Sequence, residues 1–314
     1  MFVWIGQIKW TEMRPLKGLI IYIIAVFVGS AILAPIFYEL VKFAATKIDL
    51  FQPLVGKGFH RYLTRCMMGI AIIGLIPLFR SFGVKSLKEL GLPPLKENWR
   101  KILYGFFFGF FTLLIPVIIA IGSGAANLNL NHSLTGILKH IINATLSAIM
   151  VAVLEEVLFR GGILGALRKI YDWNVAIVVS SVIYSIVHFF QRLDNISDIH
   201  WYSGFVGLAM MARGFADFNT LIPGFLNLFV AGAILGLFYK FTRNIYVSIG
   251  THCGWIFWLK SYKFFAIIQF QSNKWIFGSE KIIDGWAAFF TLLVAICVVV
   301  WVGRSKSKAP DVQG

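Results

Sequence analysis

Long, continuous apolar runs separated by short polar segments define the organisation of this chain. A helix rises about 1.5 Å per residue, so runs of roughly 17 to 25 residues can cross a hydrocarbon layer about 30 Å thick. The apolar positions do not alternate with polar ones, which excludes a transmembrane β-barrel. We therefore predict an all-α, polytopic helical membrane protein with about eight transmembrane helices, at about 18–38, 63–79, 102–122, 137–163, 173–190, 222–239, 245–263 and 282–302.

The polar segments between these runs divide the chain into three parts. Residues 1–101 hold two spans and an amphipathic surface segment that Pro93 and Pro94 interrupt. Residues 102–265 form the core, in which we expect spans four to seven to make a bundle. Residues 266–314 hold the last span and a basic tail.

Composition supports the membrane class and limits the partners. The chain is 58% hydrophobic and 14% charged, with 30 Phe and 10 Trp, which is more apolar surface than a soluble domain of 314 residues could bury. Its net charge of +15 lies in short loops beside the apolar runs, a distribution typical of contact with anionic lipid and not of nucleic-acid binding. The three cysteines form neither a disulfide framework nor a CxxC metal pair.

The distribution of Lys and Arg predicts the topology. With the N-terminus inside, the inner segments hold 16 Lys and Arg and the outer segments hold 11. Because cytoplasmic loops of membrane proteins are enriched in these residues, we predict a multi-pass protein of the cell membrane with both termini in the cytoplasm.

The fourth span carries charge where apolar residues are expected. Its sequence VAVLEEVLFRGGILGAL contains Glu155, Glu156 and Arg160. A charge at membrane depth costs roughly 2.5–3.5 kcal/mol on insertion scales and by default indicates a function. Glu156 and Arg160 are four residues apart and share a helical face, so we predict that they pair. Glu155 lies about 100° around the helix, which leaves it to act as a base.

Two histidines in later spans are candidate partners of these carboxylates. Glu155 precedes the turn near Tyr171 by 16 residues and His188 follows it by 17, so both lie roughly 25 Å from that turn. The matching depth predicts that they meet. His252 in the seventh span lies only about eight residues past its own inner turn, so the same count places it roughly 12 Å shallower.

A carboxylate and two histidines in a dry cavity suit amide or ester hydrolysis. The carboxylate can act as the general base for a water molecule, and an imidazole can donate a hydrogen bond to an oxyanion. The same residue types could hold zinc, but the sequence contains no HExxH, and the ligands would come from three separate helices. We therefore expect no required cofactor, with zinc or another divalent metal as the alternative.

The motifs resemble those of one family. EEVLFR is similar to the EExxxR signature of the CPBP membrane proteases, which comprise type II CAAX prenyl endopeptidases and bacteriocin-processing (ABI-like) proteins. YSIVH resembles the FxxxH motif of this family, with Tyr184 in place of Phe, and THCGW resembles its third motif. The resemblance covers about residues 85–265 and implies that residues 102–265 are a catalytic core.

The resemblance implies a role for each matched residue. Glu155 would activate water, with support from Glu156 and Arg160, while His188 would orient the water or the substrate and His252 would contribute to an oxyanion hole. The position four residues past His252, where the family has Asn or Asp, is Ile256. The second oxyanion donor of the family is therefore missing, unless Ser248, Thr251 or a neighbouring helix supplies it. The candidate substrate-binding residues are Tyr184, Ser248 and Thr251.

These observations lead to one prediction and two alternatives. We predict an intramembrane endopeptidase that cuts a peptide or lipidated-protein substrate, with membrane lipid as its surroundings and no nucleic-acid partner. Ile256 motivates the first alternative, a non-catalytic scaffold or immunity-type binding protein of the same fold. The second is a proton-coupled transporter, because chains of Glu and His also relay protons.

Overall fold

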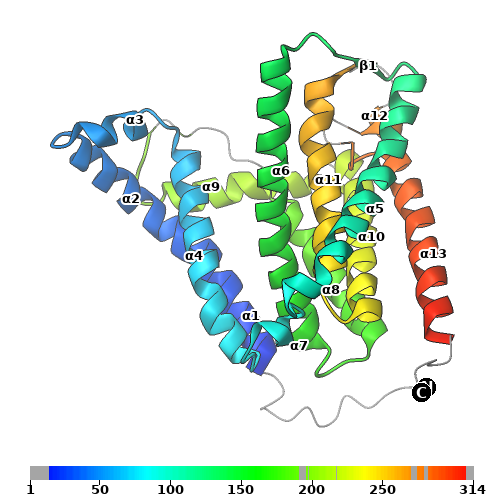
Figure 1. The fold of residues 1–314 in the computed structure, drawn as a ribbon. Coiled ribbons are helices and arrows are strands. Elements are labelled where there is room, and N and C mark those ends of the chain that lie inside the picture. Colours follow the sequence, from blue (N-terminus) through cyan, green and yellow to red (C-terminus); the bar gives the residue numbers. More distant parts are fainter. Residues whose placement is uncertain are drawn as a thin grey trace. The chain divides into compact units, whose positions relative to one another are not determined.

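Helices make up nearly all of the described structure. The computed structural model describes residues 14–190, 196, 198–216, 218–269, 274–278 and 282–308. Residues 1–13, and the end of the predicted basic tail after residue 308, lie outside the described residues. The prediction of an all-α polytopic membrane protein is confirmed (Figure 1).

Helices occupy the positions of all eight predicted spans. Among the described residues, six helical segments are long and apolar enough to cross a membrane: Lys17–Ala45, Phe59–Ser81, Leu87–Gly122, Leu134–Leu167, Leu221–Thr242 and Trp286–Ser305. The other two predicted spans are α8 (Trp173–His188), which is short, and α11 (Tyr246–Phe265). Helix α11 carries buried Ser248, Thr251 and His252, and such residues in membrane proteins face the bundle interior.

The chain divides into two compact units. The first comprises the described residues of 1–85 and 189–216. Its elements are α1 (Arg14–Ile24), the π-helix η1 (Ala25–Gly29), α2 (Ser30–Ala45), η2 (Asp49–Phe51), α3 (Gln52–Val55), α4 (Phe59–Ser81), α9 (Ser203–Met211) and η5 (Ala212–Phe215). Its core is formed by Ala34, Val41, Phe59, Tyr62, Leu63 and Met211.

The stretch 191–221 is more structured than its polar sequence predicts. Within it α9 packs on α2, and the contact is close because Gly204 has no side chain: a Cβ there would lie 1.9 Å from the carbonyl oxygen of Ala31. The predicted spans leave 191–221 as a connection, and α9 is an additional short helix within it. A helix of nine residues is too short to show a clear period in the sequence.

The second unit comprises the described residues of 86–188 and 217–314 and holds the charged fourth span. Its elements are η3 (Leu87–Leu90), α5 (Leu95–Gly122), β1 (Ala126–Leu128), α6 (Leu134–Glu156), the π-helix η4 (Val157–Leu164), α7 (Gly165–Leu167), α8, α10 (Phe218–Thr242), α11, β2 (Ala266–Ile268), α12 (Lys274–Phe277) and α13 (Trp286–Lys308). Helix α11 packs on α5 and α6, and α10 packs on α8 and α13. The predicted bundle of spans four to seven is thus extended by α5 and α13 (Figure 1).

Two local features of this unit, the start of α5 and a pair of short strands, differ from what the sequence pattern predicts. Helix α5 begins at Leu95, directly after Pro94, so the third span starts earlier than predicted. At the other end β1 pairs antiparallel with β2, with Asn127 opposite Ile267. Strands of three residues show no alternation long enough to be recognised in a sequence.

Two GxxxG motifs hold α5 and α11 together. A Cβ on Gly109 would lie 2.1 Å from the carbonyl oxygen of Thr251, and one on Gly250 would lie 2.0 Å from that of Ile102. Gly105 and Gly254 make equally close approaches one turn away. Small residues allow membrane helices to approach backbone to backbone, so these glycines fix the height and rotation of α11, which carries His252.

We expect Gly250→Ala to destabilise the protein and to reduce its activity. The new methyl group would overlap backbone, which cannot move aside as a side chain can, and overpacking of this kind typically costs about 1–3 kcal/mol. Thermal unfolding in detergent measures the effect. Gly122→Ala is the matched control, because nothing lies within 4 Å of a Cβ at that α5 position. Equal unfolding midpoints for the two variants would contradict the packing role.

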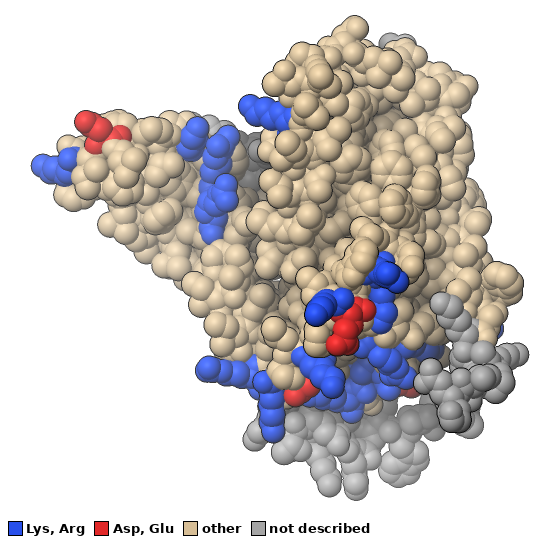
Figure 2. Space-filling model, in the orientation of Figure 1, with Lys and Arg blue, Asp and Glu red and all other residues tan. Residues whose placement is uncertain are grey.

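The segments predicted to face the cytoplasm meet at one end of this unit. Arg168 and Arg243 both stack on Trp173, and the N–H of Ile245 donates to the carbonyl of Gly91 at 2.9 Å. These contacts bring together the segment around Gly91, the turn after α7 and the turn before α11, which are three of the segments counted as inner in the distribution of Lys and Arg. Figure 2 shows Lys and Arg gathered toward the end of the view where α7 and the start of α5 lie. The orientation of this end relative to the cell stays a prediction.

Candidate active site

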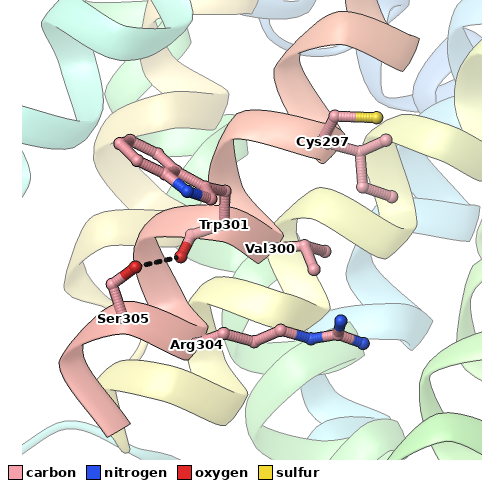
Figure 3. Close-up of a pocket in the computed structure, with 6 residues that line it drawn as sticks. Cys297, Val300, Trp301, Arg304 and Ser305 are labelled. Atoms are coloured by element: carbon pink, nitrogen blue, oxygen red, sulfur yellow. Dashed lines mark hydrogen bonds between the residues drawn. The ribbon is translucent and has the colours of Figure 1, made fainter. Parts of the chain in front are cut away.

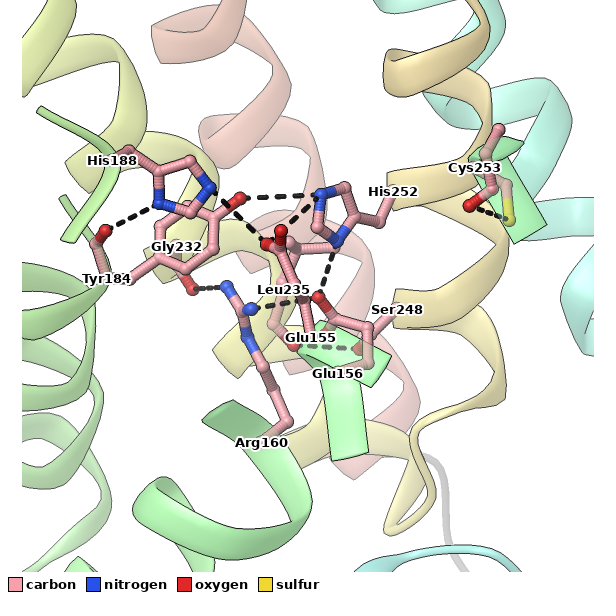
Figure 4. Close-up of polar contacts among 11 residues, drawn as sticks. Glu155, Glu156, Arg160, Tyr184, His188, Gly232, Leu235, Ser248, His252 and Cys253 are labelled. Carbon is pink, nitrogen blue, oxygen red and sulfur yellow. Dashed lines mark hydrogen bonds and ion pairs between the residues drawn. The ribbon is translucent and has the colours of Figure 1, made fainter. Parts of the chain in front are cut away.

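Charged and polar side chains from four helical elements converge inside the second unit (Figure 4). Glu155 and Glu156 are the last two residues of α6, and Arg160 follows in η4. His188 ends α8, and His252 lies near the middle of α11. The π-helix η4 begins directly after the carboxylates, and π-helical turns inside α-helices occur frequently at functional sites.

A run of small residues on α6 leads to Glu156. Its buried residues are Ala144, Ala148, Ala152 and Glu156, each four positions from the next, so they form one stripe along the helix. Cys253 of α11 packs against this stripe, with its Sγ 3.5 Å from the carbonyl oxygen of Ala148. The small side chains allow α11 to approach α6 closely, which brings His252 next to Glu156.

The predicted pair of Glu156 and Arg160 is confirmed. Arg160 Nη1 donates to Glu156 Oε1 at 2.8 Å, and the side chains of Arg160 and Glu156 are 2% and 0% exposed. Arg160 also donates through Nη2 to the carbonyl of Gly232 on α10 at 3.3 Å, and its guanidinium lies 4.7 Å from the ring centre of Tyr184. A buried charge is tolerated only with such a set of partners. This pair therefore forms a rigid structural support beneath the site.

Glu156 also sets the orientation of His252. Its Oε1 lies 2.8 Å from His252 Nδ1. An ionised carboxylate can only accept, so Nδ1 carries the proton and donates it. The same holds for His188, whose Nδ1 lies 2.8 Å from the backbone carbonyl oxygen of Tyr184. Both rings are therefore fixed with a protonated Nδ1, and both direct Nε2 toward Glu155.

The carboxylate of Glu155 lies next to the Nε2 atoms of both histidines. Its Oε2 lies 3.3 Å from His188 Nε2 and 3.8 Å from His252 Nε2. The predicted meeting of Glu155 and His188 is confirmed. Among the described residues Oε2 has no hydrogen-bond partner of acceptable geometry, although the atom is buried. The side chains of Glu155 and His188 are 26% and 28% exposed, so the site opens to its surroundings on this side.

The prediction that His252 lies shallower than the carboxylates is wrong. It assumed that the turn before α11 lies at the same depth as the turn before α8. Asn244 and Ile245 in the first turn are buried, and the N–H of Ile245 donates to the carbonyl of Gly91, whereas Tyr171 and Asp172 in the second turn are exposed. Helix α11 therefore begins inside the protein, and His252 needs fewer residues to reach the carboxylates.

The three predicted substrate-binding residues differ in their contacts. Ser248 Oγ donates to the carbonyl of Leu235 on α10 at 2.9 Å. The backbone of Thr251 lies against Gly109 of α5, and its buried hydroxyl has no hydrogen-bond partner among the described residues. The hydroxyl of Tyr184, by contrast, lies 3.4 Å from His252 Nε2. Ile256 is buried in an apolar cluster and supplies no polar group.

The described residues hold no group of three or more His, Cys, Asp or Glu side chains arranged to bind a metal ion. His252 Nδ1 faces Glu156 while its Nε2 faces Glu155, so the two carboxylates lie on different sides of the imidazole ring. The zinc alternative stays a prediction.

A hollow of about 640 Å³ lies elsewhere in this unit, along α13 (Figure 3). It is lined by Ile296, Cys297, Val300, Trp301, Arg304 and Ser305. None of these side chains belongs to the candidate active site.

Comparison with known families supports the resemblance found in the sequence. Residues 137–258 match the family model described as type II CAAX prenyl endopeptidase Rce1-like. The match covers less than half of the chain but extends from α6 into α11, so it includes both carboxylates and both histidines. The predicted resemblance to the CPBP proteases is confirmed, and it supports a CAAX-type intramembrane protease. Searches of curated proteins and of solved structures gave no match.

Sequence reasoning missed three features of the site. The glycine pairs 105/109 and 250/254 were visible as GxxxG motifs and predict close helix packing. The contact between Glu156 and His252 and the contact between Tyr184 and His252 left no signal, because each joins helices far apart in the chain.

Proposed function

We propose that this protein is an intramembrane endopeptidase in which Glu155 activates a water molecule. The observation that carries the proposal is the convergence of His188 Nε2 and His252 Nε2 on Glu155 Oε2, with both rings fixed through Nδ1. The family match of residues 137–258 supports the same reaction class.

The hydrogen-bond roles suggest how the water is held. A water molecule beside Glu155 can donate one proton to Oε2, and it then lies close to His188 Nε2, which is 3.3 Å from that oxygen. With one proton directed to Glu155, a lone pair of the water oxygen is left to face the substrate carbonyl carbon.

The reaction then balances as a general-base hydrolysis. Glu155 takes one proton as the water oxygen bonds to the carbonyl carbon, and the carbonyl oxygen becomes an oxyanion. When the carbon–nitrogen bond breaks, the proton on Glu155 passes to the leaving amine, and the carboxylate is restored. Glu156 and Arg160 take no proton in this sequence. They hold His252 and the end of α6 in place.

The substrate class follows from the surroundings of the site. The carboxylates lie within Leu134–Leu167, a helix apolar enough to cross a membrane, so the scissile bond must reach the site from within or beside the lipid. A lipidated peptide would do so with its lipid in the bilayer. The matched family description names prenylated CAAX substrates, so we propose a prenylated C-terminal peptide as the first substrate to assay and unmodified membrane-associated peptides, including bacteriocin precursors, as the second.

The test is cleavage of these peptides by the purified protein in proteoliposomes. The decisive comparison is between the wild type and Glu155→Gln. Equal cleavage by both proteins would refute the proposal.

We expect cleavage to continue after metal removal. The described side chains form no metal-binding group, and Glu155 alone can take the proton from water. Proteoliposomes dialysed against a chelator should keep their rate, and elemental analysis of the active protein should show no stoichiometric zinc. Loss of activity that added zinc restores would replace the glutamate mechanism with a metal-dependent one.

A non-catalytic binding protein is the second candidate. Ile256 favours it, because this position lies one turn past His252 and is packed among apolar side chains. Such a protein would keep its cellular effect when Glu155 is replaced by Gln, whereas a protease would lose it.

A further inference from the structure

Tyr184 lies at the centre of the site with its ring held on several sides. The side chain is 3% exposed. Its ring contacts the guanidinium of Arg160 at 4.7 Å and the ring of Phe159 edge to face at 5.0 Å. These contacts fix the ring and therefore the position of the phenolic oxygen, which lies 3.4 Å from His252 Nε2.

The direction of this hydrogen bond follows from the tautomer of His252. Because Glu156 accepts the proton of Nδ1, Nε2 of the neutral ring has no proton and can only accept. The hydroxyl of Tyr184 is therefore the donor. A neutral His252 in this tautomer cannot itself donate to an oxyanion through Nε2.

The other candidate donors make no hydrogen bond to the residues around Glu155. The hydroxyl of Ser248 donates to Leu235, the buried hydroxyl of Thr251 has no hydrogen-bond partner among the described residues, and Ile256 has no polar group. His188 directs an acceptor nitrogen at Glu155, as His252 does. Among the side chains placed around Glu155 Oε2, Tyr184 thus has the neutral O–H group that can turn toward a developing negative charge.

We propose that Tyr184 donates a hydrogen bond to the substrate carbonyl oxygen as it becomes an oxyanion, and so fills the role left open by Ile256. The proposal rests on the proposed function. The phenolic oxygen is one hydrogen bond from His252 Nε2, which is itself 3.8 Å from Glu155 Oε2, so base and donor flank the same small space. The hydroxyl proton needs only to rotate from Nε2 to the oxyanion, while the ring stays on Arg160.

The test is Tyr184→Phe, which keeps the ring and removes the hydroxyl. We expect kcat to fall about 10²–10³-fold, the usual effect of removing one oxyanion donor, with KM and the thermal unfolding midpoint little changed. A peptide aldehyde, which forms a tetrahedral adduct, should bind more weakly by a similar factor. Tyr62→Phe is the control, because it removes a buried hydroxyl that donates to Leu54 in the other unit.

The outcomes separate this proposal from the function on which it rests. Full kcat in Tyr184→Phe together with an inactive Glu155→Gln would overturn the role of Tyr184 alone. A fall in kcat with unchanged aldehyde affinity would overturn it too, because it would show that Tyr184 only positions His252. Cleavage that depends on neither residue would overturn both proposals.

Discussion

Replacing Glu155 with Gln is expected to lower kcat by about 10³–10⁴-fold, the upper part of the range for loss of a general base. The amide has the size of the carboxylate but cannot take a proton from water. The fold should be kept, because Glu155 is a quarter exposed and its nearest partners are the two histidine rings. The measurement is the cleavage rate of the substrate peptide in proteoliposomes, with thermal unfolding as the check on folding.

Glu97→Gln is the matched control for this experiment. Glu97 lies exposed in the first turn of α5, so the same chemical change there should leave both rate and unfolding midpoint unchanged. If Glu155→Gln kept the wild-type rate, Glu155 could not be the base, and the non-catalytic alternative would be favoured.

Replacing Arg160 with Met is expected to cost about 3–5 kcal/mol of stability, because it leaves Glu156 buried without its cation. Glu156 is 0% exposed and would keep only the hydrogen bond from His252 Nδ1, while the carbonyl of Gly232 would lose its donor. The midpoint of unfolding in a mild detergent measures the loss. Activity should fall as well, because His252 is held through Glu156.

A double variant tests whether the cost comes from the uncompensated charge. Glu156→Gln added to Arg160→Met removes the charge but keeps an oxygen that can accept from His252. We expect this double variant to regain part of the lost stability, since replacing both members of a buried pair is much less costly than removing one. If the double variant were less stable than Arg160→Met, packing of the Arg160 side chain on Tyr184, and not charge pairing, would be its main contribution.

Much of the fold could be predicted because the length and apolar character of a membrane helix are properties of one continuous stretch of sequence. The predicted charged span, 137–163, lies within one continuous helical segment, Leu134–Leu167. The second predicted span, 63–79, lies within the helix Phe59–Ser81. The strands β1 and β2 and the helix α9 could not be predicted. Each is short, and each is stabilised by a partner distant in the sequence, such as Ala31 for Gly204.

The candidate site divides in the same way. The pairing of Glu156 with Arg160 follows from a spacing of four residues, and the meeting of Glu155 with His188 follows from counting along two helices joined by one tight turn. The count failed for His252, because its helix begins at a buried turn whose depth is set by contacts with the segment around Gly91.

The sequence by itself determined which groups of the candidate site lie in membrane helices: two carboxylates, one guanidinium and two imidazoles, in an order that resembles one family. Residue type and helical spacing are local properties, so they can be read without knowing the neighbours. Only the tertiary structure decided that Glu156 fixes the tautomer of His252, and that Tyr184 rather than Ser248 directs its hydroxyl into the site. Those facts depend on the rotation and height of α11 against α5, α6 and α8, which packing at glycine and alanine surfaces sets and no single helix encodes.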